Sequence, residues 1–447
     1  MSTTQLIEPR TLKGFRDYLP EVMIPRERLM ETARRVYRSY GFSPIDTPAL
    51  EYLEILSGNG SDETDRQMYR FEHGGRQVGM RFDLTIPLAR FAAQHIGKLG
   101  TPFKRYHIAP VWRGENTQAG RYREFVQCDF DTIGTESIAS DVETALVIHD
   151  LLQAIGIERF QLRINNRQIL NGLLEKSGLE DRSQAVLRAI DKLEKLGPDA
   201  VDEELQRVGG LSKEQASSVL RLCKMGGDSA ELLRQLELEL DGNPTGSSGV
   251  ARLRAIINAL QSAGISDCRY RIDVTIARGL DYYTGVVFET LLQDLPSIGS
   301  VCSGGRYDNL AGLYTKQHLP GIGASLGLDR LIAAMEQLEQ LDKPKTTANV
   351  FVPFFDSERL NDYMKLCAIV RRAGYNVEFY PDSKKLGTQL KFADDRGFAV
   401  ALVAGSDELN AGSCQVKDLR NKSSELVNWN ECPQRLIEEV AKIIGLR

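Results

Sequence analysis

Residues 103–134 read FKRYHIAPVWRGENTQAGRYREFVQCDFDTIG, a basic segment between two more apolar stretches. Residues 103–112 mix β-branched and aromatic side chains without a helical period, which predicts a strand. Residues 125–133 alternate closely enough to predict a second strand. Glycines in the segment between them, residues 113–124, let the backbone turn back. The stretch therefore predicts a rigid hairpin with a basic tip.

The hairpin combines two kinds of polar side chain. Its tip holds three arginines, Arg113, Arg121 and Arg123. Guanidinium groups stay charged and bind phosphate oxygens bidentately. The returning strand carries three acceptors on one face, Gln127, Asp129 and Asp131. Two interpretations stay open, a site that joins a nucleotide to a polar small molecule and a surface hairpin with solvated arginines.

Length and composition indicate an ordinary globular protein. The chain has 447 residues, 42% hydrophobic and 26% charged, which predicts two or three domains. Its net charge is -5, so any nucleic acid must meet a local basic face. Its seven cysteines show no C-x-x-C spacing, which argues against disulfides and zinc and suits a reducing cytoplasm. Since no long apolar run occurs, we expect a cytoplasmic protein without membrane contact.

The N-terminal third reads mostly as packing elements. Helical spacing predicts a helix over residues 25–40, followed by an extended stretch that Pro44 and Pro48 keep at a sheet edge. Residues 77–91 begin as a strand and pass through Asp83 and Thr85 before Pro87 opens a helix. These two side chains either bind a ligand amine or cap that helix.

The middle of the chain changes from mixed to helical character. Residues 140–152 predict a packed helix and residues 161–165 a short strand. Residues 167–263 are leucine-rich helices broken by loops of glycine, serine and proline. We interpret them as a separate helical insertion in which no chemistry is visible.

Two later segments carry polar aromatic residues and glycines. Residues 277–289 read ARGLDYYTGVVFE, in which Tyr282 and Tyr283 follow Arg278 and precede a strand. The tyrosines suit either a ligand pocket with aromatic walls or a hairpin packed on the core. Residues 300–308, SVCSGGRYD, contain adjacent glycines that allow a ligand to approach the backbone closely.

A strand and helix are predicted over residues 321–338, with the helix beginning near Leu328. Arg330 lies in its first turn, where a cation opposes the helix dipole at a cost of about 0.3 to 1 kcal/mol. A compensating anion is therefore expected, either a bound phosphate or a nearby carboxylate.

The last hundred residues predict a small α/β domain. Three buried-looking strands alternate with helices around residues 358–373, 386–396 and 433–444, which favours a mostly parallel sheet. Its basic side chains either cover a solvated face or contact RNA. They are Lys384, Lys385, Lys391, Arg396, Lys417 and Arg420.

Together these segments resemble the class II histidyl-tRNA synthetases over nearly the whole length. The first helix and GFSPIDTPALE, with Pro48, resemble motif 1, which the family uses for dimerisation. Residues 113–127 resemble motif 2, and GASLGLDRL, with Arg330, resembles motif 3. ARGLDYYTGVVFE and SGGRYD are similar to the two histidine-specific segments of the family.

The resemblance implies an α+β architecture in which an antiparallel catalytic sheet is flanked by helices. Residues 1–166 and 264–342 would form this catalytic domain. Residues 167–263 would form the helical insertion, and residues 346–447 a C-terminal α/β anticodon-binding domain.

The resemblance also implies the activity, an ATP-dependent attachment of L-histidine to tRNA(His) through a histidyl-adenylate, with release of AMP and diphosphate. Arg113 and Arg278 would be the catalytic residues at the α-phosphate of ATP. Arg121 and Arg330 would hold the γ-phosphate end, and Mg²⁺ would neutralise the remaining charge.

By the same resemblance, seven residues would bind histidine. Asp131 and Tyr283 would pair with the imidazole, because a site with buried polar partners rejects ligands that lack them. Asp83, Thr85 and Gln127 would bind the α-amine, while Tyr282 and Tyr307 would wall the site. Some family members have glutamate at the places of Asp83 and Asp131. The aspartates here look more like the form shared with eukaryotes and archaea.

Two other functions compete with this interpretation. One is a synthetase paralogue that has lost aminoacylation and serves as a regulatory subunit in histidine biosynthesis. Such relatives typically lack the C-terminal domain and have lost the arginines that this chain keeps. The other is a non-catalytic RNA-binding protein built on the same domains.

Overall fold

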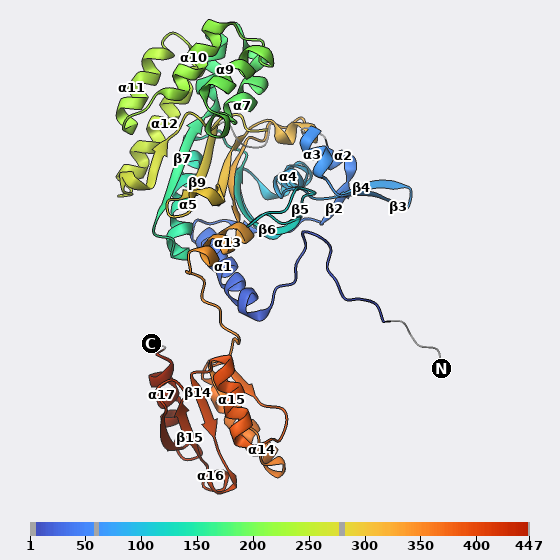
Figure 1. Cartoon of the computed structure of the whole chain (residues 1–447), viewed down its shortest axis with the longest axis vertical. Coiled ribbons are helices and arrows are strands. Elements are labelled where there is room, and N and C mark those ends of the chain that lie inside the picture. The colour runs from blue at the N-terminus through green and yellow to red at the C-terminus, as the bar shows by residue number, and fades with distance from the viewer. Residues whose placement is uncertain (1–5, 58–61, 277–281, 446–447) are drawn as a thin grey trace. The chain divides into compact units, whose positions relative to one another are not determined.

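The structure is a computed structural model that describes residues 6–57, 62–276 and 282–445 (Figure 1). The chain divides into two compact units. One unit runs up to residue 16 and from 28 to 341, and the other comprises residues 17–27 and those from 342 onward. Among the described residues, every helix is too short or too polar to cross a membrane.

An eight-stranded sheet forms the centre of the first unit. Its order is β1-β5-β6-β11-β10-β9-β7-β8, with parallel pairs at the two edges and antiparallel pairs between them. The strands are β1 (Ser43–Pro44), β5 (Phe103–Trp112), β6 (Glu124–Ile133), β7 (Phe160–Asn166), β8 (Tyr270–Ile272), β9 (Val286–Leu292), β10 (Cys302–Tyr307) and β11 (Gly321–Gly327). The predicted hairpin is therefore confirmed as β5 and β6, and the Pro44 segment does lie at an edge.

The two faces of this sheet differ in what they carry. On one face, Tyr37 of α1 (Pro20–Ser39) packs on the rings of Tyr106 and Phe130. Since side chains alternate along a strand, the neighbouring pair Arg105 and Asp131 lies on the opposite face. α4 (Thr85–Leu99) packs on that second face and brings its N-terminus to these polar residues.

Two helices begin earlier in the chain than the sequence predicted. α1 begins at Pro20, so Pro25 lies inside the helix, where it removes one backbone donor without ending it. α4 begins at Thr85 because the Asp83 carboxylate supplies the cap, two residues before Pro87.

Smaller elements complete the first unit before the helical segment. A three-stranded sheet joins β2 (Leu50–Tyr52), β4 (Arg76–Met80) and β3 (Arg70–His73). The short helices α2 (Leu53–Ser57) and α3 (Asp62–Gln67) accompany it. α5 (Ile138–Ile155) extends the predicted helix at both ends, and α13 (Leu328–Gln337) begins at the predicted residue.

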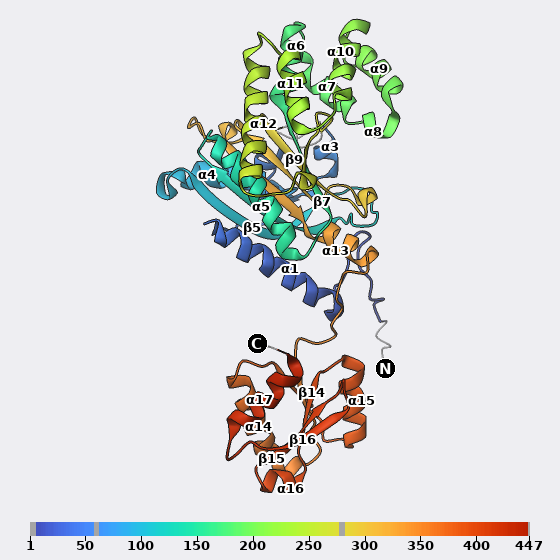
Figure 2. The same cartoon turned by 90° about the vertical axis from the view of Figure 1, so that its left-hand side faces the viewer.

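Residues 167–262 are helical, as the leucine spacing predicts. Figure 2 shows these helices gathered together, and the longest of them, α12, packs against α5 and α6. They are α6 (Arg167–Lys176), α7 (Ser183–Ile190), α8 (Leu193–Leu196), α9 (Pro198–Arg207), α10 (Lys213–Lys224), α11 (Ser229–Glu239) and α12 (Pro244–Ser262).

The second unit has a five-stranded sheet of order β13-β12-β14-β15-β16. The first three strands, β12 (Val350–Val352), β13 (Val377–Phe379) and β14 (Val400–Val403), are parallel. The antiparallel strands β15 (Ser413–Asp418) and β16 (Ser423–Asn428) follow, so the prediction of a mostly parallel sheet missed a hairpin. The short helix α16 (Ser406–Asn410) precedes this hairpin.

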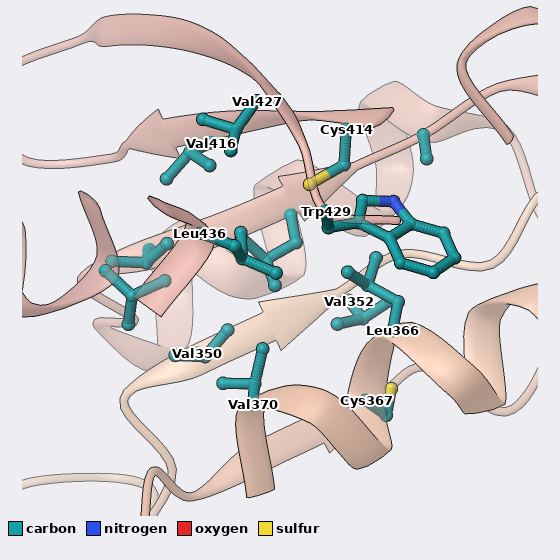
Figure 3. Close-up of a cluster of buried hydrophobic side chains, with 14 of the residues drawn as sticks. Val350, Val352, Leu366, Cys367, Val370, Cys414, Val416, Val427, Trp429 and Leu436 are labelled. Atoms are coloured by element: carbon teal, nitrogen blue, oxygen red, sulfur yellow. The ribbon is translucent and has the colours of Figure 1, made fainter. Parts of the chain in front are cut away.

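Helices cover both faces of this smaller sheet. α14 (Leu360–Arg372) and α17 (Pro433–Ile444) enclose one core with the strands, where Val350, Leu366 and Trp429 meet (Figure 3). α15 (Leu386–Arg396) packs on the opposite face around Phe351. The unit thus has its own hydrophobic core.

Candidate active site

Three buried carboxyl groups interact electrostatically on the second face of the large sheet. Asp83 precedes α4, while Asp129 and Asp131 lie on β6, and each is at most 3% exposed. Burial raises the pKa of all three, that of Asp129 to about 7. Several buried carboxyl groups with perturbed pKa values are characteristic of a site that receives a cationic or N–H-donating ligand.

Asp83 carries out the capping role that its sequence position allowed. Its Oδ1 accepts hydrogen bonds from the backbone N–H groups of Thr85 at 3.1 Å and Ile86 at 2.9 Å. Its Oδ2 accepts a longer bond, 3.4 Å, from the Tyr282 hydroxyl. The cap fixes the carboxylate while Oδ2 retains capacity for a ligand, so the two interpretations of Asp83 are compatible.

Asp131 is held from two sides. Its Oδ1 accepts the Tyr307 hydroxyl at 2.5 Å, and its Oδ2 lies 2.7 Å from the Arg105 guanidinium. Gly323 lies opposite on β11, where a Cβ atom would come 2.2 Å from Oδ1. The position therefore requires glycine.

Gln127 contributes an acceptor to the same face. Its Nε2 donates to the Ser325 hydroxyl at 2.9 Å, which orients the amide. Its Oε1 is buried and has no hydrogen-bond partner among the described residues. An oriented amide oxygen of this kind suits an ammonium or N–H donor.

Three tyrosine rings enclose the carboxyl groups. The Tyr282 ring centroid lies 5.1 Å from that of Tyr283 and 5.9 Å from that of Tyr307. Glycines make room for these rings, since a Cβ on Gly305 would lie 3.0 Å from Tyr283 and one on Gly321 2.3 Å from Tyr307. Gly305 in SGGRYD thus leaves room for the Tyr283 ring. The sequence predicted that the glycines of this segment let a ligand approach the backbone.

Three arginines converge beside this cluster. Arg113 donates from Nε to the Phe82 carbonyl at 3.1 Å, and Arg330 donates to the Ser300 carbonyl at 2.6 Å. Burial and the positive charges of Arg121 and Arg113 lower the pKa of Arg330. Like charges gathered in this way repel one another, so the arrangement favours a polyvalent anion.

The carboxyl and arginine groups adjoin. The charge of Arg113 opposes the burial that raises the pKa of Asp83. Gly120 lets the hairpin loop approach α13, because a Cβ there would lie 3.3 Å from the Cα of Arg330. Arg278, predicted at the α-phosphate, lies outside the described residues. An anionic reactant would thus lie next to an amine-bearing one.

Sequence reasoning missed several residues around this site. Arg105 lies directly across from Asp131 on β5, and this register could have been derived from the hairpin. Arg16, in the N-terminal segment, forms a 3.1 Å ion pair with Asp329 and donates to the Tyr122 hydroxyl at 2.9 Å. That contact joins residues more than a hundred positions apart, and no local pattern signals it.

Family models match almost the whole chain. One described as Histidyl-tRNA synthetase matches residues 14–331, and one described as Anticodon binding domain matches residues 349–439. The first alone spans more than half of the sequence.

Individual relatives agree with these models. The histidine–tRNA ligase of Rhodopirellula baltica is 62% identical over 97% of this chain and 99% of its own length. That of Wolinella succinogenes is 46% identical over 94% of this chain and 96% of its own. The crystal structure of histidyl-tRNA synthetase from Nostoc sp. PCC 7120 superposes with a TM-score of 0.87 at 35% identity, covering 98% of this chain and 100% of that one.

Proposed function

The chain belongs to the histidyl-tRNA synthetase family, and we propose that it ligates L-histidine to tRNA(His) with ATP, releasing AMP and diphosphate. The observation that carries the proposal is the proximity of two complementary groups of side chains. Buried carboxyl groups lie within electrostatic reach of the arginines that converge near the tip of the hairpin.

In the first step, the carboxylate of histidine attacks the α-phosphorus of ATP and diphosphate leaves. Arg113 and Arg278 are proposed to stabilise the charge that grows on the α-phosphate oxygens. Arg121 and Arg330 are proposed to hold the γ-phosphate end. Arg113 and Arg330 are already fixed by backbone carbonyls, which supports preorganisation of their charges.

Histidine itself is assigned to the carboxyl side of the site. Asp83 and Gln127 retain acceptor capacity for the α-ammonium group, with Thr85 beside them. Asp131 is proposed to accept an imidazole N–H. The rings of Tyr282, Tyr283 and Tyr307 supply the walls. An amino acid whose side chain has no N–H donor would leave Asp131 without its ligand partner.

In the second step, a terminal hydroxyl of the tRNA attacks the carbonyl carbon of the adenylate. The C–O–P linkage breaks on the carbonyl side, and AMP leaves with its phosphate. No side-chain nucleophile is required. The second unit is proposed to bind the anticodon, consistent with its match to the Anticodon binding domain.

Mg²⁺ is proposed to enter with the nucleotide. The described residues contain no group of three or more His, Cys, Asp or Glu side chains placed to hold a metal ion. Mg²⁺ characteristically binds through substrate phosphates with one or two carboxylates. Glu115 and Glu289, which both act electrostatically on Arg330, are the proposed carboxylates. When bound, the ion would neutralise phosphate charge.

A homodimer through the motif 1 region is part of the proposal. Leu50 and Tyr52 of β2 are each 46% exposed, and Phe71 of β3 is 45% exposed. Large apolar side chains grouped on one small sheet suit a second copy of the chain. Sedimentation of the purified protein tests this, with a dimer expected and a stable monomer contradicting it.

The domain division and the location complete the proposal. Residues 1–166 and 264–342 are assigned to the catalytic domain, residues 167–263 to the insertion and residues 346–447 to the anticodon-binding domain. A cytoplasmic location is proposed from cysteine chemistry, since Cys268 and Cys432 are exposed free thiols.

The regulatory-subunit alternative is disfavoured by the relatives at 62% and 46% identity, which are histidine–tRNA ligases. The test is exchange of labelled diphosphate into ATP by the purified protein without tRNA, beside Arg278→Ala. We expect exchange that requires histidine and is nearly abolished in the variant. Absence of exchange, or equal exchange with other amino acids, would overturn the proposal in favour of the regulatory paralogue.

A further inference from the structure

Arg105 is the largest of the fully buried side chains in the described part of the chain. A guanidinium group cannot give up its proton, so its burial destabilises the fold unless its charge is matched. Its Nη2 lies 2.7 Å from Oδ2 of Asp131 and 3.4 Å from the Leu84 carbonyl. Its Nε and Nη1 have no hydrogen-bond partner among the described residues. Arg105 is therefore directed at Asp131.

The contact lies on the ligand-facing side of the sheet. Arg105 and Asp131 are directly opposite each other in the β5–β6 register, on the face that also carries Gln127. The Tyr307 hydroxyl donates to Oδ1 of Asp131, and the Arg105 guanidinium forms a close ion pair with Oδ2. Such a carboxylate has a fixed orientation and still has lone pairs free for a further donor.

We propose that Arg105 is the positioning residue of the histidine site, whose buried guanidinium favours the charged form of Asp131 and fixes it as an acceptor for an imidazole N–H. The proposal rests on the assignment of Asp131 to histidine made above. Arg105 itself does not contact substrate in this account. It acts through Asp131 and thereby sets which amino acids bind.

The charges around Asp131 determine what loss of Arg105 does. Burial raises the pKa of Asp131, and Arg105 is the strongest influence that lowers it. Without Arg105, the remaining carboxyl groups favour a protonated Asp131, which no longer presents two charged acceptor oxygens. In the part of the chain that the structure describes, five titratable or charged groups face Asp131. They are Arg105 on β5, Asp129 on β6, Asp83 before α4, Tyr283 before β9 and Tyr307 on β10.

The main variant is Arg105→Met, which retains the length of the side chain and removes its charge. We expect the KM for histidine in diphosphate exchange to rise about 10- to 100-fold at neutral pH, as for loss of one partner of a buried ion pair. The KM for ATP should change little. The ratio of variant to wild-type KM, measured from pH 6 to 8.5, should fall as pH rises, because a rising pH favours the charged form of Asp131 that Arg105 no longer supports. The titration of free histidine affects the KM of both proteins equally, so it cancels in this ratio.

Arg81→Met is the matched control. Arg81 is another buried arginine, 3% exposed, whose guanidinium donates to the backbone carbonyls of Pro110 at 2.9 Å and Thr47 at 2.7 Å. Its loss should lower the melting temperature and leave the ratio of histidine KM values independent of pH. Arg105→Lys restores the charge without the planar fork, so its KM should stay within about tenfold of wild type.

Diphosphate exchange by the wild-type protein distinguishes failure of the proposed function from failure of the Arg105 proposal. If that exchange does not require histidine, the proposed function itself is overturned. If wild type requires histidine, a KM in Arg105→Met that is unchanged, or raised equally at every pH, would overturn the role of Arg105. Should Arg105→Met fail to fold, Arg105→Lys decides. A KM within about tenfold of wild type then supports the proposal, and a larger increase contradicts it.

Discussion

At the scale of single residues, Asp129 illustrates what burial does to a carboxyl group. It is 2% exposed, and its Oδ1 has no partner among the described residues. Burial raises its pKa to about 7, against the opposing charge of Arg105. The folded protein therefore holds a proton that the unfolded chain has already released. Stability should accordingly fall as pH rises from about 4 to about 7.

Asp129→Asn tests this pH dependence. Asparagine cannot ionise, so the variant should gain stability relative to wild type across that interval, by about 4 kcal/mol at most. Melting temperatures of both proteins without ligands at pH 4.5, 5.5, 6.5 and 7.5 provide the measurement. A difference in melting temperature that stays constant over the series would contradict the assignment.

Gly323→Ala tests the close packing around Asp131. The new methyl group would lie 2.2 Å from Asp131 Oδ1 and 2.3 Å from the Phe130 carbonyl, so the carboxylate must move. We expect the KM for histidine to rise about tenfold or more, since overpacking of this kind costs about 1 to 3 kcal/mol. Gly312→Ala, which meets no atom within 4 Å, is the control and should bind histidine normally.

The sequence predicted which residues line the site better than it predicted which side chains they contact. Asp83 was recognised as a helix cap or a ligand group, and its two oxygens make both roles possible. Arg105 escaped notice because a buried cation within a strand-like stretch looks like any surface arginine. Its role depends on Asp131, which lies across the hairpin, and therefore on the register in which the two strands pair.

At the scale of elements, the N-terminal segment supports the basic hairpin loop. The backbone N–H of Arg123 donates to the Gly14 carbonyl at 2.8 Å, and Arg16 bonds the Tyr122 hydroxyl. Gly14 has a φ of +87°, and a Cβ there would lie 2.8 Å from the Thr117 side chain. The loop that carries the proposed ATP-binding arginines is thus held by residues far away in sequence.

Gly14→Ala should loosen this loop. The KM for ATP should rise several-fold in diphosphate exchange, with less change in the KM for histidine, because the displaced side chains adjoin Arg121. Gly41→Ala is a matched control, since Gly41 has a similar φ of +79° but no atom within 4 Å of the new methyl group. Both variants carry backbone strain. Equal effects on the KM for ATP would contradict the role of the segment.

Element boundaries were predicted best in the hairpin and in the helix that follows residue 327. β5, β6 and α13 begin and end within a residue or so of expectation. The β15–β16 hairpin was missed because Lys417 and Arg420 were considered as basic side chains and not as part of a strand and its turn. Lys417 pairs with Ala401 of β14, and this pairing depends on tertiary contacts that the polarity of the segment does not reveal.

At the scale of the whole molecule, adenylate chemistry and anticodon binding are assigned to different units, each with its own core. The alternation of strands and helices in the last hundred residues predicted the second unit, and the resemblance implied its role. Effects on tRNA should therefore separate from effects on histidine activation.

Replacing Lys384, Lys385 and Lys391 by alanine tests that separation. These exposed cations lie at and just before α15, on one face of the smaller sheet. The triple variant should lower kcat/KM for tRNA about tenfold or more and weaken its salt dependence, with diphosphate exchange unchanged. Replacing Lys365 and Arg372 of α14, on the opposite face, is the control. Equal losses from both faces would contradict the assignment.

The most direct test of the central claim is the charging of total tRNA by the purified protein with ATP and each labelled amino acid in turn. We predict that only histidine becomes attached, that only tRNA(His) carries it, and that one AMP forms for each histidine transferred. Histidine-dependent exchange without any charging of tRNA(His), or charging with a different amino acid, would contradict the account.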